Sequence, residues 1–349
     1  MPLSLMLAAA WSIAPSRLWS GFVAIIYYCV ASRGLPIGAA TYFEINVFSG
    51  VVLWVVGCSL LSIPFVIFWG KAAKHKALFF PLILVIVSLP PFGLVGWTNP
   101  ITSAGIVFPG SGFVGLFGVF LVVSLFAYKP TSSVIVILGV AGLFLLDTDK
   151  VYQPSTWEGV NTSEKIDTGS ANHINVYLRH QKLTNIANAS HANNVLFPES
   201  AAGLWTDSSK SLWERSSTNK SVFIGAEVSK GRSSDNVLIR IDPTGSDIIY
   251  KQRMPVPISM YRPWSDGGTN AYWFASPVVN IDGLNAGVLI CYESLLVWPV
   301  LHSAIKADYL ISIGNFWWAK DTSIPTIQNS AVFSWAKLFG LPLVSASNR

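Results

Sequence analysis

Three residues of types that cooperate in covalent catalysis lie at or near the ends of predicted strands. Cys291 directly follows the apolar run Val288–Ile290. Glu199 closes a second apolar run, and Lys251 lies on a third. A thiol becomes a nucleophile when a nearby base takes its proton, and a tetrahedral intermediate needs a cation or N–H donors at its oxyanion. The sequence therefore predicts Cys291 as nucleophile, Glu199 as base and Lys251 as the cation.

Each of these residues alone has a plainer structural explanation. Cys291 could simply fill a core, because cysteine is among the most buried residue types. Glu199 could be a solvated turn carboxylate, and Lys251 a charge that protects an edge strand from aggregation. His302 offers a Cys–His dyad instead, but a helix starting near Leu295 would point that imidazole away from the sulfur. Only the set in the order Glu, Lys, Cys favours catalysis.

The motifs around the three residues resemble those of a known superfamily. They read Phe-Pro-Glu ending at Glu199, Tyr-Lys ending at Lys251 and Ile-Cys-Tyr-Glu around Cys291. In this order they resemble the nitrilase (carbon–nitrogen hydrolase) superfamily over roughly residues 176–348. The resemblance implies that Glu199, Lys251 and Cys291 form a triad that works through a thioester.

The apolar N-terminal half narrows the resemblance to the membrane branch typified by apolipoprotein N-acyltransferases. Two pieces, 31–36 and 96–105, look closer to the TraB-type conjugal transfer proteins of that branch. The resemblance implies acyl transfer or amide hydrolysis in the setting of conjugal transfer. Two alternatives stay open: an apolipoprotein N-acyltransferase that moves a phospholipid acyl chain to a lipoprotein amine, and a non-catalytic membrane component of a conjugation apparatus.

The resemblance also suggests supporting residues and partners. The Tyr292 backbone N–H would help Lys251 to hold the oxyanion. Glu293 would either support the site or act as a carboxylate at a helix N-terminus. A membrane lipid is the candidate acyl donor, an amine or amide such as a protein N-terminus the candidate substrate, and the conjugation machinery a candidate partner.

The sequence departs from the acyltransferase pattern beside the site. Ser259 stands where a glutamate is expected, and a hydroxyl cannot accept a proton at neutral pH. The run Asn315–Ala319 lacks the acid found in the family, and Ser334 and Lys337 stand near a late Arg/Glu pair. Such changes reduce activity more often than they change its class. They favour a side branch, such as the conjugal transfer proteins, over lipoprotein N-acylation.

Charge is distributed unevenly along the chain. Charged residues make up 12% of the 349 residues, against about 25% in an average soluble domain. Residues 45–70 and 77–128 carry no charge, and about 20 apolar residues span a bilayer. We therefore predict an N-terminal multi-span α-helical membrane domain over 1–150 with about five or six spans, including 18–32 and 133–146.

The basic loop between two of these spans sets the expected orientation. It holds Lys71, Lys74 and Lys76, and cytoplasmic loops are rich in Lys and Arg. Counting spans onward places everything after Asp147 outside. We therefore expect a multi-pass protein of a bacterial inner membrane, with its second domain on the periplasmic side.

The second half has the pattern of an α/β domain. Residues 151–172 are polar and predict a linker, and strands alternate with helices over 173–349. Two β-type runs flank the turn Asp242–Gly245 and predict a hairpin. The resemblance implies the α-β-β-α sandwich of nitrilases. It also implies further elements after Asn348, so we expect a shortened C-terminus.

Several function classes are disfavoured by the sequence. The polar half has no cluster of Lys and Arg with interleaved aromatic residues, so no nucleic-acid partner is expected. Glu44 is the one acidic residue among the predicted spans and lies at a span edge, which disfavours a transporter. There is no metal-ligand spacing and no phosphate-binding glycine loop, so we predict no metal and no cofactor. Three cysteines give no disulfide framework.

Overall fold

The chain divides into two compact units. The computed structural model describes residues 2–131, 151–164, 173–215 and 220–349. The helical unit comprises Met1–Val151, Leu295–Leu301 and Asp321–Leu341, and the sheet unit comprises Tyr152–Ser294, His302–Lys320 and Pro342–Arg349. The first boundary lies next to the predicted one at residue 150. The return of two later segments to the helical unit was not foreseen.

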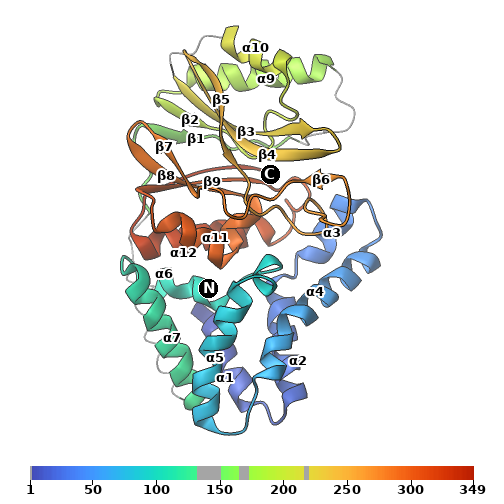
Figure 1. The fold of residues 1–349 in the computed structure, drawn as a ribbon, viewed down its shortest axis with the longest axis vertical. Coiled ribbons are helices and arrows are strands. Elements are labelled where there is room, and N and C mark those ends of the chain that lie inside the picture. The colour runs from blue at the N-terminus through green and yellow to red at the C-terminus, as the bar shows by residue number, and fades with distance from the viewer. Residues whose placement is uncertain (1, 132–150, 165–172, 216–219) are drawn as a thin grey trace. The chain divides into compact units, whose positions relative to one another are not determined.

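The helical unit consists of apolar helices joined by short turns (Figure 1). Its elements are η1 (Pro2–Leu5), α1 (Met6–Ile13), α2 (Arg17–Ala31), α3 (Leu35–Phe43), α4 (Val47–Ile67), α5 (Ala73–Ser88), η2 (Phe92–Leu94), η3 (Pro100–Ser103), α6 (Ala104–Val107), α7 (Gly112–Tyr128) and α12 (Ile324–Phe339). Aromatic rings fill its interior. Trp11, Phe65 and Phe80 are fully buried, and the Trp11 indole donates to the Phe65 carbonyl at 2.9 Å.

The number of long apolar helices is lower than the sequence predicts. Among the described residues, α4 alone is long and apolar enough to cross a membrane by itself. The pair α2 and α3 is bent by 60°, and a second pair, Pro100–Val107 with α7, by 119°; counting each pair as one span raises the number to three. Near Asn99 and Pro100 the uncharged segment 77–128 is broken by the short helices η2, η3 and α6. The predicted span 133–146 lies outside the described residues.

The outer surface of the longer helices is strongly apolar. Side chains on α2, α4 and α7 are more than 40% exposed although they are large and hydrophobic. They include Phe22, Ile26, Val30, Phe48, Val52, Val56, Leu60, Val114, Phe117 and Leu121. Apolar patches of this extent are rare on soluble monomers and are typical of surfaces that another apolar phase covers.

Helix α12 follows Glu199, Lys251 and Cys291 in sequence but packs within the helical unit. A Cβ built on Gly105 of α6 would lie 1.6 Å from the Ser334 carbonyl oxygen, so the two backbones touch and only glycine fits. Gly110 N–H also donates to the Lys337 carbonyl at 2.8 Å. Helix α12, which would belong to an outer helical layer of the expected α-β-β-α sandwich, therefore packs as part of the helical unit. Its buried side chains contact α6 and α7.

The sheet unit contains two β-sheets and three helices, one of which is shared with the helical unit (Figure 1). The first sheet has the order β1-β2-β3-β4-β5, with β6 paired to β4, and the second the order β10-β9-β8-β7. The strands are β1 (Trp157–Gly159), β2 (Asn194–Leu196), β3 (Ser221–Lys230), β4 (Ser233–Asp242), β5 (Gly245–Lys251), β6 (Gly268–Thr269), β7 (Val278–Ile281), β8 (Leu284–Ile290), β9 (Tyr309–Asn315) and β10 (Leu343–Asn348). The helices are α9 (His173–Ala189), α10 (Asp207–Arg215) and α11 (Val297–Ala304), the last of which begins in the helical unit.

Alternation along the strands gives each sheet two distinct faces. Leu238 and Tyr250 face the second sheet and pack with Val288 and Ile290 in a shared core. Neighbouring residues on the other face, such as Val237, pack with α9 and α10 in a separate core. Successive side chains on a strand point to opposite faces. The predicted β4–β5 hairpin and its turn are confirmed.

The predicted linker over 151–172 is wrong for part of its length. Trp157–Gly159 forms β1, which pairs in parallel with β2. Trp157 is buried in the core between the sheets, where its ring packs 4.7 Å from that of Phe223. Burial of the large Trp157 indole stabilises this strand although the surrounding residues are polar. The sequence-based prediction of a linker considered only the polar composition of the segment.

Candidate active site

Three parallel strands end together and present polar side chains at one edge. Strands β8, β9 and β10 run parallel, and their last positions lead to Cys291, Asn315 and Asn348. The carboxyl ends of parallel strands are the usual place for a site in such sheets. The Asn348 amide donates to the Asn315 side-chain oxygen at 2.9 Å and accepts from Thr162 at 2.8 Å. This edge is therefore held in register by side-chain amides.

The Cys291 backbone adopts a conformation that is uncommon for a residue with a side chain. Its φ is 51°, in the left-handed region, at the start of the short helix η4 (Cys291–Leu295). Such strained positions occur where the surrounding structure fixes a side chain in a required direction. The thiol is buried, and it is held between the Glu199 carboxyl and the backbone N–H groups of Asn315 and Tyr292. The expected Tyr292 N–H is thus beside the sulfur.

Glu199 and Cys291 are brought together, as the motifs predict. The Glu199 side chain is 3% exposed and shares a hydrogen bond with the Cys291 thiol. Burial raises the pKa of the Glu199 carboxyl to about 7, although hydrogen bonds from Cys291 and Asn236 lower it in part. Burial also raises the pKa of the Cys291 thiol, and the neighbouring carboxylate raises it further. The first proton lost from the pair therefore leaves near neutral pH, and the thiol proton is retained.

A glycine on the adjacent strand lets the Glu199 loop approach the sheet. A Cβ built on Gly225 of β3 would lie 2.5 Å from both Glu199 Cα and the Pro198 carbonyl oxygen. Gly225 N–H donates to that same carbonyl at 3.2 Å. The position of Glu199 thus depends on the missing side chain at residue 225.

Two buried amide side chains extend from Glu199 across β4 and β5. Asn236 Nδ2 donates to Glu199 Oε1 at 2.7 Å and to Gln252 Oε1 at 3.0 Å. Gln252 Nε2 donates to the Ile290 carbonyl at 3.0 Å, in the peptide bond that precedes Cys291. Asn236 and Gln252 are 3% and 0% exposed. The sequence motifs did not single out either residue, although Gln252 directly follows the Tyr-Lys motif.

Lys251 is not on this chain of contacts. Its ammonium group forms an ion pair with Asp235 at 2.9 Å and lies 4.9 Å from the Tyr272 ring centre. Asp235 also accepts from Asn270 Nδ2 and from the Tyr272 hydroxyl, each at 2.7 Å. Lys251 pairs across the ladder with Val237, whose side chain faces α9 and α10. In this structure Lys251 therefore lies on the face of the sheet opposite to Cys291.

Glu293 holds the strand ends rather than the reacting atoms. Its carboxylate accepts from the backbone N–H groups of Ile290 at 2.7 Å, Arg253 at 2.6 Å and Met254 at 3.2 Å. The Tyr250 hydroxyl donates to it at 3.1 Å. These contacts join the end of β5 to the end of β8, so Glu293 acts as a clamp beneath the turn that carries Cys291.

The remaining predicted residues lie away from the sulfur. His302 Nδ1 contacts the Arg253 guanidinium at 3.3 Å, so the structure does not favour the Cys–His dyad. Burial and the charge of Arg253 lower the pKa of His302. Ser259 donates to the Val256 carbonyl at 3.5 Å and makes no described contact with Glu199. The Trp318 indole donates to the Asn315 carbonyl at 3.1 Å, directly after β9.

Comparisons with known proteins agree with the motifs. The family model described as carbon–nitrogen hydrolase matches residues 84–337. "Conjugal transfer protein TraB" of Agrobacterium fabrum is 32% identical, with 100% of this chain and 87% of that protein covered. "Probable conjugal transfer protein TraB" of Sinorhizobium fredii is 34% identical, with 100% and 92% covered.

Some solved structures resemble part of this chain in fold. An amidase from Nesterenkonia sp. has a TM-score of 0.41 at 16% identity, with 58% of this chain and 80% of that chain covered. A carbon–nitrogen hydrolase from Helicobacter pylori has a TM-score of 0.40 at 13% identity, with 54% and 72% covered. From the family match and the full-length relatives, the chain belongs to the carbon–nitrogen hydrolase family and is a homologue of the TraB conjugal transfer proteins.

Proposed function

We propose that this chain is a membrane-anchored enzyme of conjugal transfer that uses Cys291 and Glu199 for acyl transfer or amide hydrolysis. The observation that carries the proposal is the buried contact between the Cys291 thiol and the Glu199 carboxyl, at the carboxyl end of β8. A carboxyl with a pKa of about 7 is suited to accept and return a proton at neutral pH.

The proposed reaction has two steps. Glu199 takes the thiol proton while the Cys291 sulfur bonds to the substrate carbonyl carbon, whose oxygen becomes an oxyanion. The intermediate collapses to a thioester, and the leaving group departs with the proton held by Glu199. Water or an amine then attacks the thioester carbon, Glu199 accepts its proton, and the thiolate leaves and is reprotonated. The Tyr292 N–H beside the sulfur is the candidate oxyanion donor.

A membrane lipid is the proposed acyl donor, because the same chain carries an apolar helix long enough to span a bilayer. The test is the intact mass of the detergent-purified protein after incubation with phospholipid. We expect an acyl-sized increment that hydroxylamine removes, absent from Cys291→Ala and retained by the control Cys29→Ala. No increment, with the Cys291 thiol still open to alkylation, would contradict a lipid donor and leave a soluble amide as the substrate.

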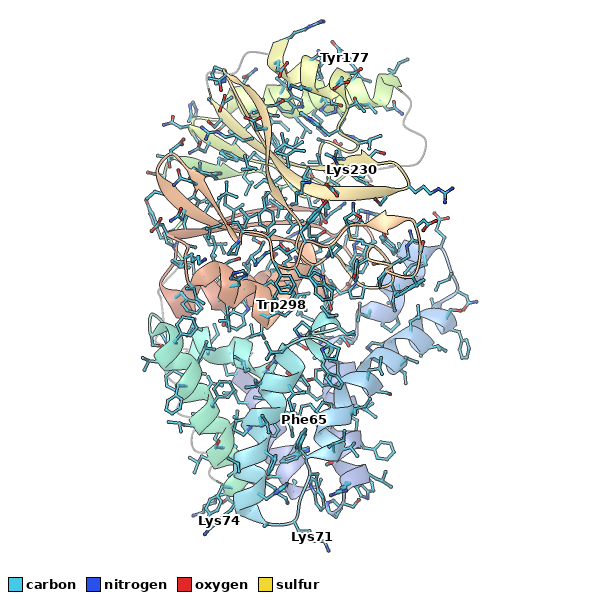
Figure 2. All side chains as sticks on the ribbon, viewed as in Figure 1. Phe65, Lys71, Lys74, Tyr177, Lys230 and Trp298 are labelled. Atoms are coloured by element: carbon cyan, nitrogen blue, oxygen red, sulfur yellow. The ribbon has the colours of Figure 1, made fainter. Side chains whose placement is uncertain are left out.

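The basic turn between α4 and α5 supports the proposed orientation. Figure 2 shows Lys71 and Lys74 at the end of the helical unit where these two helices meet. Cytoplasmic loops are rich in such residues, which places the sheet unit on the periplasmic side in this proposal. Alkaline phosphatase fused after Arg349 should be active, and the same enzyme fused after Lys74 inactive. The reverse pattern would refute this orientation.

A non-catalytic role in the transfer apparatus is the second candidate. It is favoured by Lys251, whose ammonium group is paired with Asp235 on the opposite face of the sheet. One experiment separates the two candidates: the frequency of plasmid transfer from cells that carry the Cys291→Ala variant. Loss of transfer, with the protein accumulating at its normal level, supports the enzyme. Unchanged transfer supports the structural component.

A further inference from the structure

We propose that Gln252, directly after β5, serves the Cys291 site in place of Lys251, the last residue of β5, and positions Glu199 and the nucleophile turn. This inference rests on the proposed roles of Cys291 and Glu199. It assigns the role at the site to the residue next to the predicted lysine, whose side chain points to the opposite face of the sheet.

The strand register determines which of the two residues, Lys251 or Gln252, faces the core that contains Cys291. Tyr250 lies in the core between the two sheets together with Cys291. Gln252 is two residues further on and shares that face, whereas Lys251 between them faces away. The backbone agrees, since Gln252 N–H donates to the Asn236 carbonyl at 2.8 Å and continues the β4–β5 ladder. A shift of one residue along a strand exchanges its two faces.

The contacts of Gln252 reach both partners of the proposed reaction. Its oxygen accepts from Asn236, whose Nδ2 also donates to Glu199 Oε1, so it fixes the direction of the Asn236 amide. Its Nε2 donates to the Ile290 carbonyl, one peptide bond before Cys291. An amide can accept and donate at once, which a lysine cannot. Gln252 thus links the base to the turn that carries the nucleophile.

The contacts of Lys251 account for it without a role at the sulfur. Asp235, which is fully buried, receives Lys251 together with Asn270 and Tyr272. Asn270 and Tyr272 belong to the long segment between β5 and β7, so their hydrogen bonds to Asp235 tie that segment to β4. Lys251 is a structural cation here, and the face toward Cys291 carries neutral amides.

The test is the pH dependence of Cys291 alkylation by iodoacetamide in the full-length protein in detergent. Peptide mass spectrometry separates Cys291 from Cys29 and Cys58. Alkylation needs no substrate, so its result is independent of whether a lipid or an amide is the acyl source. The variants are Gln252→Met, Gln252→Lys and the neighbouring control Lys251→Met, each first checked for a native-like melting transition.

The two Gln252 variants should move the profile in opposite directions. Gln252→Met removes the partner that holds Asn236 on Glu199, so the midpoint should rise by about half a pH unit or more. Gln252→Lys places a cation near the carboxylate, so the midpoint should fall by about one unit. Lys251→Met should leave the midpoint in place. The inference is overturned if Gln252→Met leaves the midpoint unchanged, or if Lys251→Met shifts it as far as Gln252→Met does.

Discussion

At the scale of single residues, the Glu199–Cys291 pair determines how the thiol responds to pH. Burial holds both groups in their protonated forms, and the first proton lost from the pair leaves with a pKa of about 7. Loss of that proton creates a state in which Glu199 can withdraw the remaining proton from sulfur. Nucleophilicity at Cys291 should therefore rise as pH increases through 7, well below the range expected for a buried thiol alone.

Replacing the base should remove this response. In Glu199→Gln the thiol must ionise without help, and burial keeps its pKa high. We expect the rate of Cys291 alkylation at pH 7.5 to fall by tenfold or more, on the order of a typical general-base contribution. We also expect the midpoint of the pH profile to move well above 7. An unchanged midpoint near 7 would show that Glu199 does not control the thiol.

The Glu293 clamp makes a second prediction at this scale. Its carboxylate is fully buried and accepts hydrogen bonds from three backbone N–H groups. Glu293→Gln would replace one acceptor oxygen by an NH2 group, which would face those N–H donors without an acceptor. Loss of one partner from a buried charged network costs about 3–5 kcal/mol. A large fall in melting temperature in detergent should follow. The control Asp266→Asn, in a surface pair with Arg232, should change stability by less than about 1 kcal/mol.

At the scale of elements, the approach of β3 to the Glu199 loop makes the third prediction. Gly225→Ala would place a methyl group 2.5 Å from the Glu199 backbone, which cannot yield as a flexible side chain would. We expect Glu199 to move, and Cys291 alkylation at pH 7.5 to fall toward the level of Glu199→Gln. Overpacking of this kind also costs about 1–3 kcal/mol.

The neighbouring residue provides the control for that experiment. Ala226 lies in the core on the other face of β3, so Ala226→Gly changes volume without touching Glu199. It should lower stability by about 1 kcal/mol and leave the alkylation profile in place. If both variants lose reactivity equally, the effect belongs to the strand as a whole and not to the position of Glu199.

The elements also show which parts of the site a sequence can specify. Glu199 and Cys291 were predicted to meet because each follows a buried strand. That prediction requires only the positions at which the strands end. Assigning Lys251 or Gln252 to the site requires the face of β5, which depends on the register with β4. An irregularity between Leu238 and Ile239 alters that register, and no local pattern in the sequence reveals it.

At the scale of the whole molecule, the chain passes between its two units several times. Leu295–Leu301 and Asp321–Leu341 leave the sheet unit shortly after Cys291 and Asn315 and join the helical unit. The predicted boundary near residue 150 separates most of the helical unit from most of the sheet unit, but it does not account for these two later segments, which pack in the helical unit. Long-range contacts such as that between Gly105 and Ser334 bring the later segment into the helical unit. Composition alone cannot indicate such contacts.

The apolar surface of α4 makes the last prediction, which separates a membrane span from a buried soluble helix. Val56 lies near the middle of α4 and is 53% exposed. On a soluble protein, Val56→Asp would be harmless because it replaces an exposed apolar residue with a polar one. At the centre of a span the same change costs about 3 kcal/mol, so it should reduce the carbonate-resistant membrane fraction and the total protein. Val56→Leu is the matched control and should behave as the unmodified chain. Normal accumulation and normal membrane partition of Val56→Asp would contradict α4 as a span, and the lipid-donor proposal would lose the observation that supports it.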